Sequence, residues 1–437
     1  MDSNRPLSFK QLSFFFIPLG ISSSLTSISH VIINGTLSRG ENAAFIIACY
    51  AVAMSMFGLF ERSMIIFRHT SSALVQDRQS FQKIGKFFLY VSIVIMSLST
   101  IIAFSPIGPW MYTNFFNADE NMVDAISITY KVISIVIILS GVRGLYQGVI
   151  IQQLATNWLT IGVVVRLIGM FIISGLLIAL DYVTSVSGAL IFLTGMLIEC
   201  GISVYKGQSL LKHEIKAKDQ TYQLYHSDIA RFYFPLVLYF FMQSILVPII
   251  YILLSQANDI EMSIASFALA VSIVNMILGF FMYTHQLVIQ FYKNHTKKKV
   301  IQFVFMMSTI PTLLLIILCY TPIGMTFMQV IMGADESLSL ATIAVLKFFI
   351  IKTFIFPWVD FLNGFLMLHR QTNKMLFAQA GNLIVVILSL FIFVRIWPHL
   401  NGINGSIASA LGEIAGFIII SLIVYLMRKN QRVPQHD

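Results

Sequence analysis

Long apolar runs separated by short polar segments fill the chain from residue 12 to residue 427. A bilayer core is about 30 Å thick, and a helix needs about 20 mostly apolar residues to cross it. Twelve runs reach this length. We therefore predict twelve transmembrane helices, at residues 12–35, 43–66, 86–104, 125–148, 158–180, 184–205, 230–254, 263–285, 300–320, 340–366, 376–396 and 405–427.

The second half of the sequence repeats features of the first half. Ser105-Pro-Ile-Gly108 matches Thr321-Pro-Ile-Gly324, and Ala118-Asp-Glu120 matches Ala334-Asp-Glu336 at the same difference in residue number, which we call the repeat offset. Further matches at this offset, or at one residue more, are Lys131 with Lys347, Gly148 with Gly364, Thr156-Asn157 with Thr372-Asn373, Pro18 with Pro235, Gly188 with Gly405, and Gly195 with Gly412. The predicted fold class is an all-α polytopic membrane protein of two parallel six-helix repeats, related by a two-fold axis along the membrane normal.

The repeat defines the expected domains. We predict an N-lobe at 1–205, a cytoplasmic linker at 206–228, a C-lobe at 229–427 and a cytoplasmic tail at 428–437. Two-lobed membrane proteins of this kind usually bind substrate between the lobes near mid-membrane, and work by rocking one lobe against the other.

Composition and charge narrow the class of protein. Apolar side chains make up 57% of the chain and charged ones 11%, against about 25% charged in soluble domains, which excludes a soluble enzyme and a disordered protein. Basic residues gather on one side of the predicted topology, with 22 of the 28 lysines and arginines there, whereas the loops of the other side hold only Arg39. By the positive-inside rule, both termini are cytoplasmic in a multi-pass protein of the plasma (inner) membrane. The net charge of +9 therefore indicates topology and not nucleic-acid binding.

A polar stripe follows the first predicted span. Ser23, Ser27, His30 and Asn34 are spaced i, i+4, i+7 and i+11 and so share one helical face. Such a face would be costly in lipid, so we expect it to line a water-filled cavity. The alternative is that its hydroxyl groups bond back to their own helix. The predicted substrate-cavity residues, including those of the seventh span, are Ser23, Ser27, His30, Asn34, Gln243 and Ser244.

Charged residues within predicted spans are candidates for a gate, a structural pair or ion coupling. They are Glu61, Arg62, Lys131, Arg143, Arg166, Glu199, Lys347, Asp360 and Glu413. Arg166 and Glu199 lie at a similar depth, roughly 10–13 Å from the cytoplasmic ends of their spans, so they can pair either for structure or for function. Glu61 and Arg62 admit the same two interpretations.

Four of these residues suggest roles that depend on the repeat. Arg143 and Asp360 occupy almost equivalent positions and could meet as an inner gate, unless Arg143 snorkels to the cytoplasmic surface. Lys131 and Lys347 recur near the outer ends of their spans, where they either snorkel or act at the outer mouth. Glu413, in mid-membrane, either carries a proton or pairs with a structural partner; Lys352 and Arg395 are the candidates.

Several motifs are missing from the sequence. It contains no GxxxxGK[ST], HExxH, GxSxG or CxxC. Cys49, Cys200 and Cys319 lie in apolar runs, so we expect no disulfide framework. We therefore predict a protein that is not an enzyme and has no cofactor, namely a carrier that either equilibrates its substrate or uses a gradient of H⁺ or Na⁺.

Some segments resemble a known family. Phe16-Ile-Pro-Leu-Gly-Ile21, Asn34-Gly35, Ala103-Phe-Ser-Pro-Ile-Gly108 with Asp119-Glu120, and Asn363-Gly-Phe-Leu-Met367 resemble the progressive ankylosis protein and its bacterial relatives. These belong to the superfamily of multidrug and toxic compound extrusion (MATE) transporters and polysaccharide or lipid flippases. The resemblance implies twelve helices in a two-lobed V and export by alternating access, often as antiport with protons or sodium.

The chain also departs from that pattern. Drug-extruding members often carry an acidic coupling residue in the first helix, and this chain has only His30 and Asn34 there. Ankylosis-like members are associated with export of organic anions and phosphates, which agrees with the positive charge of Lys131, Arg143, Arg166 and Lys347. We predict a monomeric, ion-coupled antiporter that exports a small anionic organic solute or drug across the plasma membrane. A lipid-linked precursor flippase and a non-transporting membrane scaffold are the alternatives.

Overall fold

A computed structural model describes residues 8–153, 155, 157–215, 223–282, 284–292, 296–368 and 373–430. All regular structure in these ranges is helical. Ten of the helices are long and apolar enough to cross a membrane. They are α2 (Ala43–Leu74), α3 (Arg78–Phe104), α5 (Glu120–Gln152), α6 (Asn157–Ala179), α7 (Ser185–His213), α10 (Ile260–Gly279), α12 (Lys297–Tyr320), α14 (Glu336–Leu368), α15 (Asn373–Ile396) and α16 (Gly402–Asn430).

The remaining two predicted spans are also helical. The first lies in α1 (Phe9–Leu37), and the seventh is divided between α8 (His226–Ser244) and α9 (Leu246–Leu254). Pro248 lies in the first turn of α9, and a proline cannot donate to the carbonyl four residues earlier, which accounts for the division. The arrangement as twelve spans stays a prediction.

Two connections between predicted spans are helical. α4 (Ile107–Phe116) follows α3, and α13 (Pro322–Thr326), which continues into a π-helical turn at Phe327–Ile331, follows α12. These segments are apolar but too short to cross a bilayer, so a search for spans passes over them. The structure also extends α7 to His213, inside the predicted linker, and breaks the predicted span 263–285 between α10 and α11 (Thr284–Phe291).

Helix bounds recur through the chain in the same way as the sequence motifs. Both ends of α5 are related to those of α14 by the repeat offset, and both ends of α7 are related to those of α16 by one residue more. The helices between them, α6 and α15, begin at Asn157 and Asn373, which are again related by the repeat offset. The internal repeat is therefore one of secondary structure as well as of sequence.

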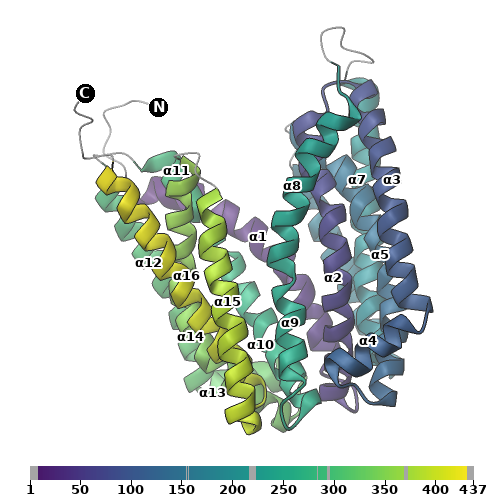
Figure 1. The fold of residues 1–437 in the computed structure, drawn as a ribbon, viewed down its shortest axis with the longest axis vertical. Helices are drawn as coiled ribbons and strands as arrows, with labels where there is room; N and C mark the ends of the chain where they lie inside the picture. The colour runs from purple at the N-terminus through teal and green to yellow at the C-terminus, as the bar shows by residue number, and fades with distance from the viewer. Residues whose placement is uncertain are drawn as a thin grey trace. The chain divides into compact units, whose positions relative to one another are not determined.

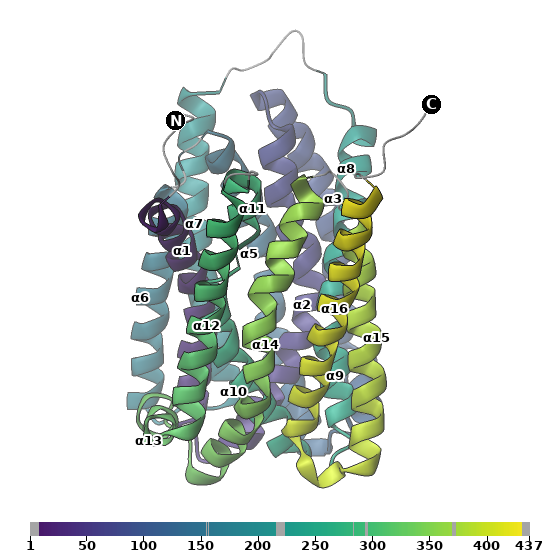
Figure 2. The ribbon, with the colours of Figure 1, turned by 90° about the vertical axis from the view of Figure 1, so that its left-hand side faces the viewer.

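The chain forms two compact units, each with one central helix. Unit 2 contains Ile32–Ser255, and α5 packs there against α2, α3 and α7 (Figure 1). Unit 1 contains Met1–Val31 and Gln256–Asp437, and α14 packs there against α10, α11, α12 and α16 (Figure 2). The helices at the centres of the two units, α5 and α14, are therefore equivalent in the repeat.

The units do not follow the predicted lobe boundary. α8 and α9 belong to unit 2, where the Tyr233 ring lies 4.8 Å from that of Phe67 and its hydroxyl donates to the carbonyl of Ser63 at 2.8 Å. Most of α1 belongs to unit 1, where Phe16 packs edge-on against Phe280 and Phe303. The predicted lobes stay a hypothesis about the moving parts.

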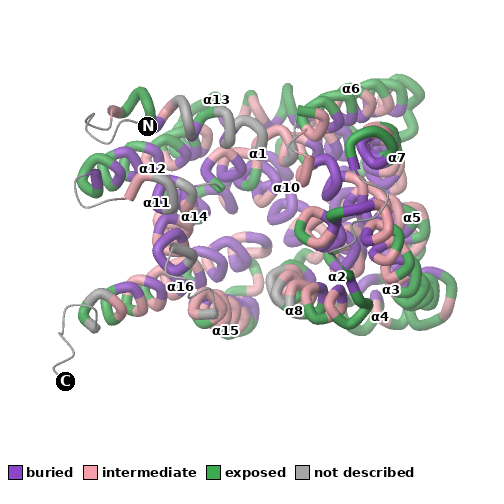
Figure 3. Tube along the Cα trace, turned by 90° about the horizontal axis from the view of Figure 1, so that it is seen from above, coloured by how far each residue is buried: buried purple, intermediate pink, exposed green. Residues whose placement is uncertain are grey.

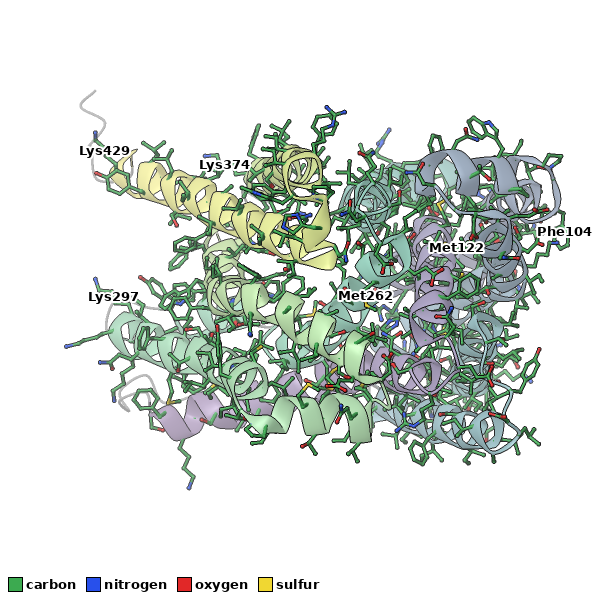
Figure 4. All side chains as sticks on the ribbon, turned by 90° about the horizontal axis from the view of Figure 1, so that it is seen from below. Phe104, Met122, Met262, Lys297, Lys374 and Lys429 are labelled. Carbon is green, nitrogen blue, oxygen red and sulfur yellow. The ribbon has the colours of Figure 1, made fainter. Side chains whose placement is uncertain are left out.

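Apolar side chains cover the outside of both units. Of the 18 most apolar consecutive residues in each helix, only 22% are buried in α3 and 28% in α6, compared with 67% in α2. Figure 3 shows the exposed positions of α3 and α6 on the outer side of unit 2. Figure 4 labels Lys297, Lys374 and Lys429 on one side of unit 1, away from Met262. An apolar belt with basic residues at one end is the pattern expected of a multi-pass membrane protein.

The repeated Ala-Asp-Glu motif has a structural cause. Asp119 Oδ1 accepts a hydrogen bond from the N–H of Met122 at 2.8 Å, and Asp335 Oδ1 accepts one from Leu338 at 3.1 Å. Each aspartate thus caps the start of the central helix of its half, and the following glutamate lies in the first turn, where a negative charge is favourable.

The repeated Pro-Ile-Gly motif marks a close approach of backbone segments. A Cβ at Gly108 would lie 2.1 Å from the carbonyl oxygen of Ile102, and one at Gly324 would lie 1.8 Å from that of Leu318. Only glycine fits at these two positions without moving the backbone.

We expect Gly324→Ala to destabilise the protein by about 1–3 kcal/mol, the usual cost of overpacking, and Gly108→Ala to act similarly. Thermal unfolding of the detergent-solubilised chain measures this effect. Gly201→Ala is the control, because a Cβ there meets nothing within 4 Å. An unchanged unfolding temperature for both variants would contradict the close approach.

Candidate functional site

A cluster of charged side chains lies inside unit 2, where α5, α6 and α7 pack together. Arg143 of α5 and Arg166 of α6 both donate to Oε2 of Glu199 on α7, at 2.8 and 2.6 Å. Gln147, one turn after Arg143, donates to Oε1 of Glu199 at 2.9 Å. Both oxygens of this carboxylate are therefore held, and charge-assisted hydrogen bonds from two guanidinium groups keep it ionised. The pairing of Arg166 with Glu199 is the one that their similar depth predicts.

Glu61 of α2 extends the cluster to a fourth helix. Its carboxylate accepts a hydrogen bond from Ser140 at 2.9 Å. Ser140 lies three residues before Arg143 on α5, so the two side chains share a side of that helix. Arg62 is exposed. The structure thus places Glu61 in the cluster and Arg62 at the surface. For both residues, the choice between a structural and a functional role stays open to experiment.

The cluster is almost completely shielded from solvent. The side chains of Arg166 and Glu199 are each 4% exposed, and that of Arg143 is 12% exposed. The Nε of Arg143 is buried and has no hydrogen-bond partner within the described residues. Guanidinium groups bind carboxylates and phosphates through several parallel N–H donors, so this unused donor is a candidate contact for a second anionic group.

The described part of unit 1 contains two ion pairs of different composition. Lys352 on α14 lies 3.2 Å from Glu413 on α16, and it is one of the two cations predicted as partners of Glu413. Further along α14, Asp360 accepts a hydrogen bond from the main-chain N–H of His285 at 2.8 Å. Both carboxylate oxygens of Asp360 lie 3.1 Å from Nδ1 of the same histidine. α14 continues through Pro357, close to Asp360.

The two residues of the predicted inner gate have partners in their own units. Arg143 is bonded to Glu199 in unit 2, and Asp360 is bonded to His285 in unit 1. Their pairing with each other stays a prediction.

The two repeated lysines make equivalent contacts. Lys131 Nζ lies 5.5 Å from the centre of the Phe104 ring, and Lys347 Nζ lies 5.4 Å from that of the Tyr320 ring. Both lysines are exposed, and the two aromatic residues are themselves related by the repeat offset. An exposed lysine above an aromatic ring is a cation–π contact of modest energy. It is compatible with both predicted roles, snorkelling and a place at the outer mouth.

The polar stripe of α1 is not uniform along its length. Asn34 is buried, Ser27 is half-buried and His30 is exposed. In the seventh span, Ser244 donates to the carbonyl of Phe240 at 2.9 Å, so it bonds back to its own helix. The side chains of Ser23 and Gln243 lie outside the part of the structure that is described. Cavity lining by these residues stays a prediction.

Two functional candidates in the structure were not predicted from the sequence. Gln147 joins the cluster of unit 2, and its position four residues after Arg143 is the only signal that points to it. His285 pairs with Asp360, and its signal is the repeat, since His69 precedes it by the repeat offset. Among the residues that the structure describes, no group of three His, Cys, Asp or Glu side chains is placed to hold a metal ion.

Comparisons with known proteins find similarity in structure and not in sequence. No protein-family model matches the chain, and neither does any curated protein sequence. The chain is similar in structure to a multidrug resistance MATE family transporter of the MOP superfamily in an inward-facing conformation (TM-score 0.70, 15% identity, covering 92% of this chain and 96% of that one). It is also similar to the lipid II flippase MurJ in an inward closed conformation (TM-score 0.71, 13% identity, 93% and 87%). A third similar structure is that of the MATE multidrug transporter DinF-BH (TM-score 0.65, 15% identity, 98% of both chains).

These similarities cover nearly the entire chain and assign its fold. It has the all-helical polytopic membrane fold of MOP superfamily transporters. The similar structures are transporters and not enzymes. The narrower resemblance to the progressive ankylosis protein stays a prediction.

Proposed function

We propose that the chain is a secondary active transporter that exports a small anionic organic solute across the plasma (inner) membrane by alternating access, as an antiporter coupled to H⁺ or Na⁺. The observation that carries this proposal is the buried cluster of unit 2, in which two guanidinium groups share the single carboxylate of Glu199. Charged residues inside membrane helices are expensive and usually mark a substrate or ion pathway.

The fold and the repeat support a carrier. Similar structures include MATE transporters and a lipid II flippase, all of which move a solute or lipid across a membrane. Helix bounds that recur at a nearly constant offset are typical of transporters in which one repeat moves against the other. On this proposal the protein acts as a monomer with both termini in the cytoplasm.

The unused donor favours an anion over a cation. The cluster holds two guanidinium groups and the carboxylates of Glu199 and Glu61, and Arg143 keeps a buried N–H donor without a partner among the described residues. An anion can accept from this donor, whereas a cationic drug cannot and would meet the guanidinium charge itself. The polar residues of α1 and the seventh span (Ser23, Ser27, His30, Asn34, Gln243 and Ser244) would complete the path of the solute.

Transport by the purified chain in lipid vesicles tests the proposal. The vesicles are offered a panel of labelled carboxylates, phosphates and cationic dyes, with proton and sodium gradients imposed separately. We expect at least one anion to move faster than in protein-free vesicles and to respond to one of the gradients, while the dyes do not move. Movement of dyes alone would overturn the anionic substrate, and no movement of any solute would favour a non-transporting scaffold.

A second candidate function is the flipping of a lipid-linked precursor. It is favoured by the similarity to the lipid II flippase, which covers 93% of this chain at a TM-score of 0.71. A fluorescent polyprenyl-phosphate-linked sugar, reconstituted in the same vesicles and quenched from outside, distinguishes the two. Faster translocation of this lipid, with no transport of soluble anions, would establish the flippase.

A further inference from the structure

The second half of the chain interrupts a helix that the first half keeps whole. α10 ends at Gly279 and α11 begins at Thr284, whereas the equivalent helix α2 runs without a break from Ala43 to Leu74. At the repeat offset, His285 corresponds to His69, and Asp360 corresponds to Gly144. Both halves thus have a histidine at this position of the fold, but only the second half has a carboxylate opposite it.

The interruption makes room for that carboxylate. A Cβ at Gly144 would lie 3.2 Å from the main-chain nitrogen of Arg68, so α2 and α5 meet there backbone to backbone. Where the helix is broken, the first turn of α11 has N–H groups without helical partners, and these groups favour an anion. Asp360 uses this position, since it accepts the main-chain N–H of His285 at 2.8 Å and contacts its imidazole at 3.1 Å. The carboxylate therefore fastens the start of α11 to α14.

This pair differs in chemistry from the other ion pairs of the described helices. Arg143 and Arg166 hold Glu199, and Lys352 holds Glu413. Arginine keeps its proton in proteins, and an ordinary lysine loses its proton only near pH 10. Histidine ordinarily titrates at about pH 6.5. Among these pairs, only that of His285 and Asp360 can change its charge near neutral pH without separating.

We propose that His285 and Asp360 form the proton-binding site of the carrier, and that the proton controls how α11 is held on α14. The assignment rests on the proposed transport function, whose coupling ion it names. A proton from solution binds the imidazole, and the charge of the pair changes from −1 to zero. When the proton leaves, the attraction between the two side chains is lost, and the N–H groups at the start of α11 alone balance the charge of Asp360.

Other charged groups near the pair do not replace it in this range of pH. α11 contains no other charged residue, and the nearest charged residue on α14 is Lys352, which is paired with Glu413. The elements that share a core with α11 also include α1, α12, α15 and α16. Apart from Lys352 and Asp360, the described charged residues and histidines of α1, α12, α14, α15 and α16 in unit 1 are Lys10, His30, Lys297, Lys298, Lys299, Glu336, Lys347, Lys374, Arg395, Glu413 and Lys429. His30 is the one histidine in this set, and its substitution is therefore an additional control.

Trp358 reports on the pair without any substrate. It lies two residues before Asp360 on α14, and its ring packs 5.9 Å from that of Phe361. The full chain with Trp110, Trp158 and Trp397 replaced by phenylalanine is placed in lipid nanodiscs, and its emission is recorded from about pH 5 to about pH 8.5, around the ordinary titration of histidine. We expect one titration, which is lost in both His285→Gln and Asp360→Asn.

Matched controls make the test specific. His69→Gln removes the equivalent histidine, which stacks on Phe240 at 5.9 Å; the first half has Gly144 at the position that corresponds to Asp360. This variant and His30→Gln should keep the titration. Hydrogen exchange of residues 284–291 in the chain with all its tryptophans gives a second measurement, and its dependence on pH should disappear in His285→Gln. Asp360→Asn keeps an acceptor for the start of α11, so a folded variant remains available if His285→Gln does not fold.

The outcomes separate this inference from the transport function. A titration that persists in His285→Gln and Asp360→Asn, or one that disappears in His69→Gln or His30→Gln, overturns the site even if the vesicles transport an anion. A titration that depends on the pair, in a chain that transports nothing, keeps the proton site and overturns the carrier.

Discussion

Glu199→Gln is expected to lower the free energy of unfolding by about 3–5 kcal/mol, the largest stability effect of any substitution considered for this protein. The glutamate is 4% exposed and is paired with both Arg143 and Arg166. Removing its charge takes the shared counter-ion away from two buried guanidinium groups, and breaking a buried ion pair on one side costs this much. Chemical unfolding in detergent, followed by circular dichroism, measures the change.

Two further variants make the result specific to charge. Glu214→Gln, at the exposed end of the same helix, should change stability by no more than about 0.5 kcal/mol, as is usual at the surface. The double variant Glu199→Gln, Arg166→Gln should regain part of the loss, because it removes one of the two guanidinium charges that Glu199 balances. Equal stability of the Glu199→Gln protein and the original would contradict the account of the cluster.

Arg143→Gln is expected to reduce anion transport roughly tenfold to a hundredfold while the protein stays folded. Glu199 keeps its bonds to Arg166 and Gln147 in this variant, so the cluster retains a counter-ion. The anion loses a charged donor, and a hydrogen bond to a charged group contributes about 1.5–3 kcal/mol, with a factor of ten for each 1.4 kcal/mol. Initial rates of uptake at low anion concentration in vesicles measure the change.

A matched arginine controls for the loss of charge. Arg231 is exposed at the start of α8, and Arg231→Gln should transport at the original rate. Arg143→Lys should recover only part of the activity, because an ammonium group lacks the planar set of donors that binds a carboxylate or phosphate on two sides. Full transport by Arg143→Gln would remove this arginine from the path of the anion.

Much of the fold can be predicted from hydrophobic runs and the internal repeat. The runs place helices at all twelve expected positions, because length and polarity decide what fits a bilayer. The repeat offset, applied to the two ends of α5, predicts where α14 begins and ends. Short helices such as α4 were not predicted, because an apolar segment of ten residues is too short to be identified as a transmembrane helix.

The break before α11 could not be predicted from local sequence. Gly279 is followed by Phe280 and Phe281, and this apolar stretch reads as the continuation of a span. What favours the break is tertiary: Asp360, 75 residues away from His285, binds the N–H groups that the break exposes. A contact over that distance in sequence becomes visible only when both halves are compared position by position.

The charged site was predicted in part. Arg166 and Glu199 were expected to meet because their depths in neighbouring spans are similar, and the structure pairs them at 2.6 Å. Arg143 was considered for a gate with Asp360 or for snorkelling; in the structure it bonds to Glu199, and the gate stays a prediction. Depth along a helix follows from residue number, whereas the direction in which a side chain points depends on helix rotation, which an apolar sequence leaves undetermined.

Exchange of a labelled anion across the vesicle membrane tests the central claim, that this chain is an anion carrier, most directly. Vesicles that contain the chain are loaded with an unlabelled anion from the panel and diluted into a trace of the same anion in labelled form, without an ion gradient. We predict transient accumulation of label above equilibrium, and its loss in Arg143→Gln but not in Arg231→Gln. Label that enters no faster than in protein-free vesicles, for every anion tested, would contradict the claim.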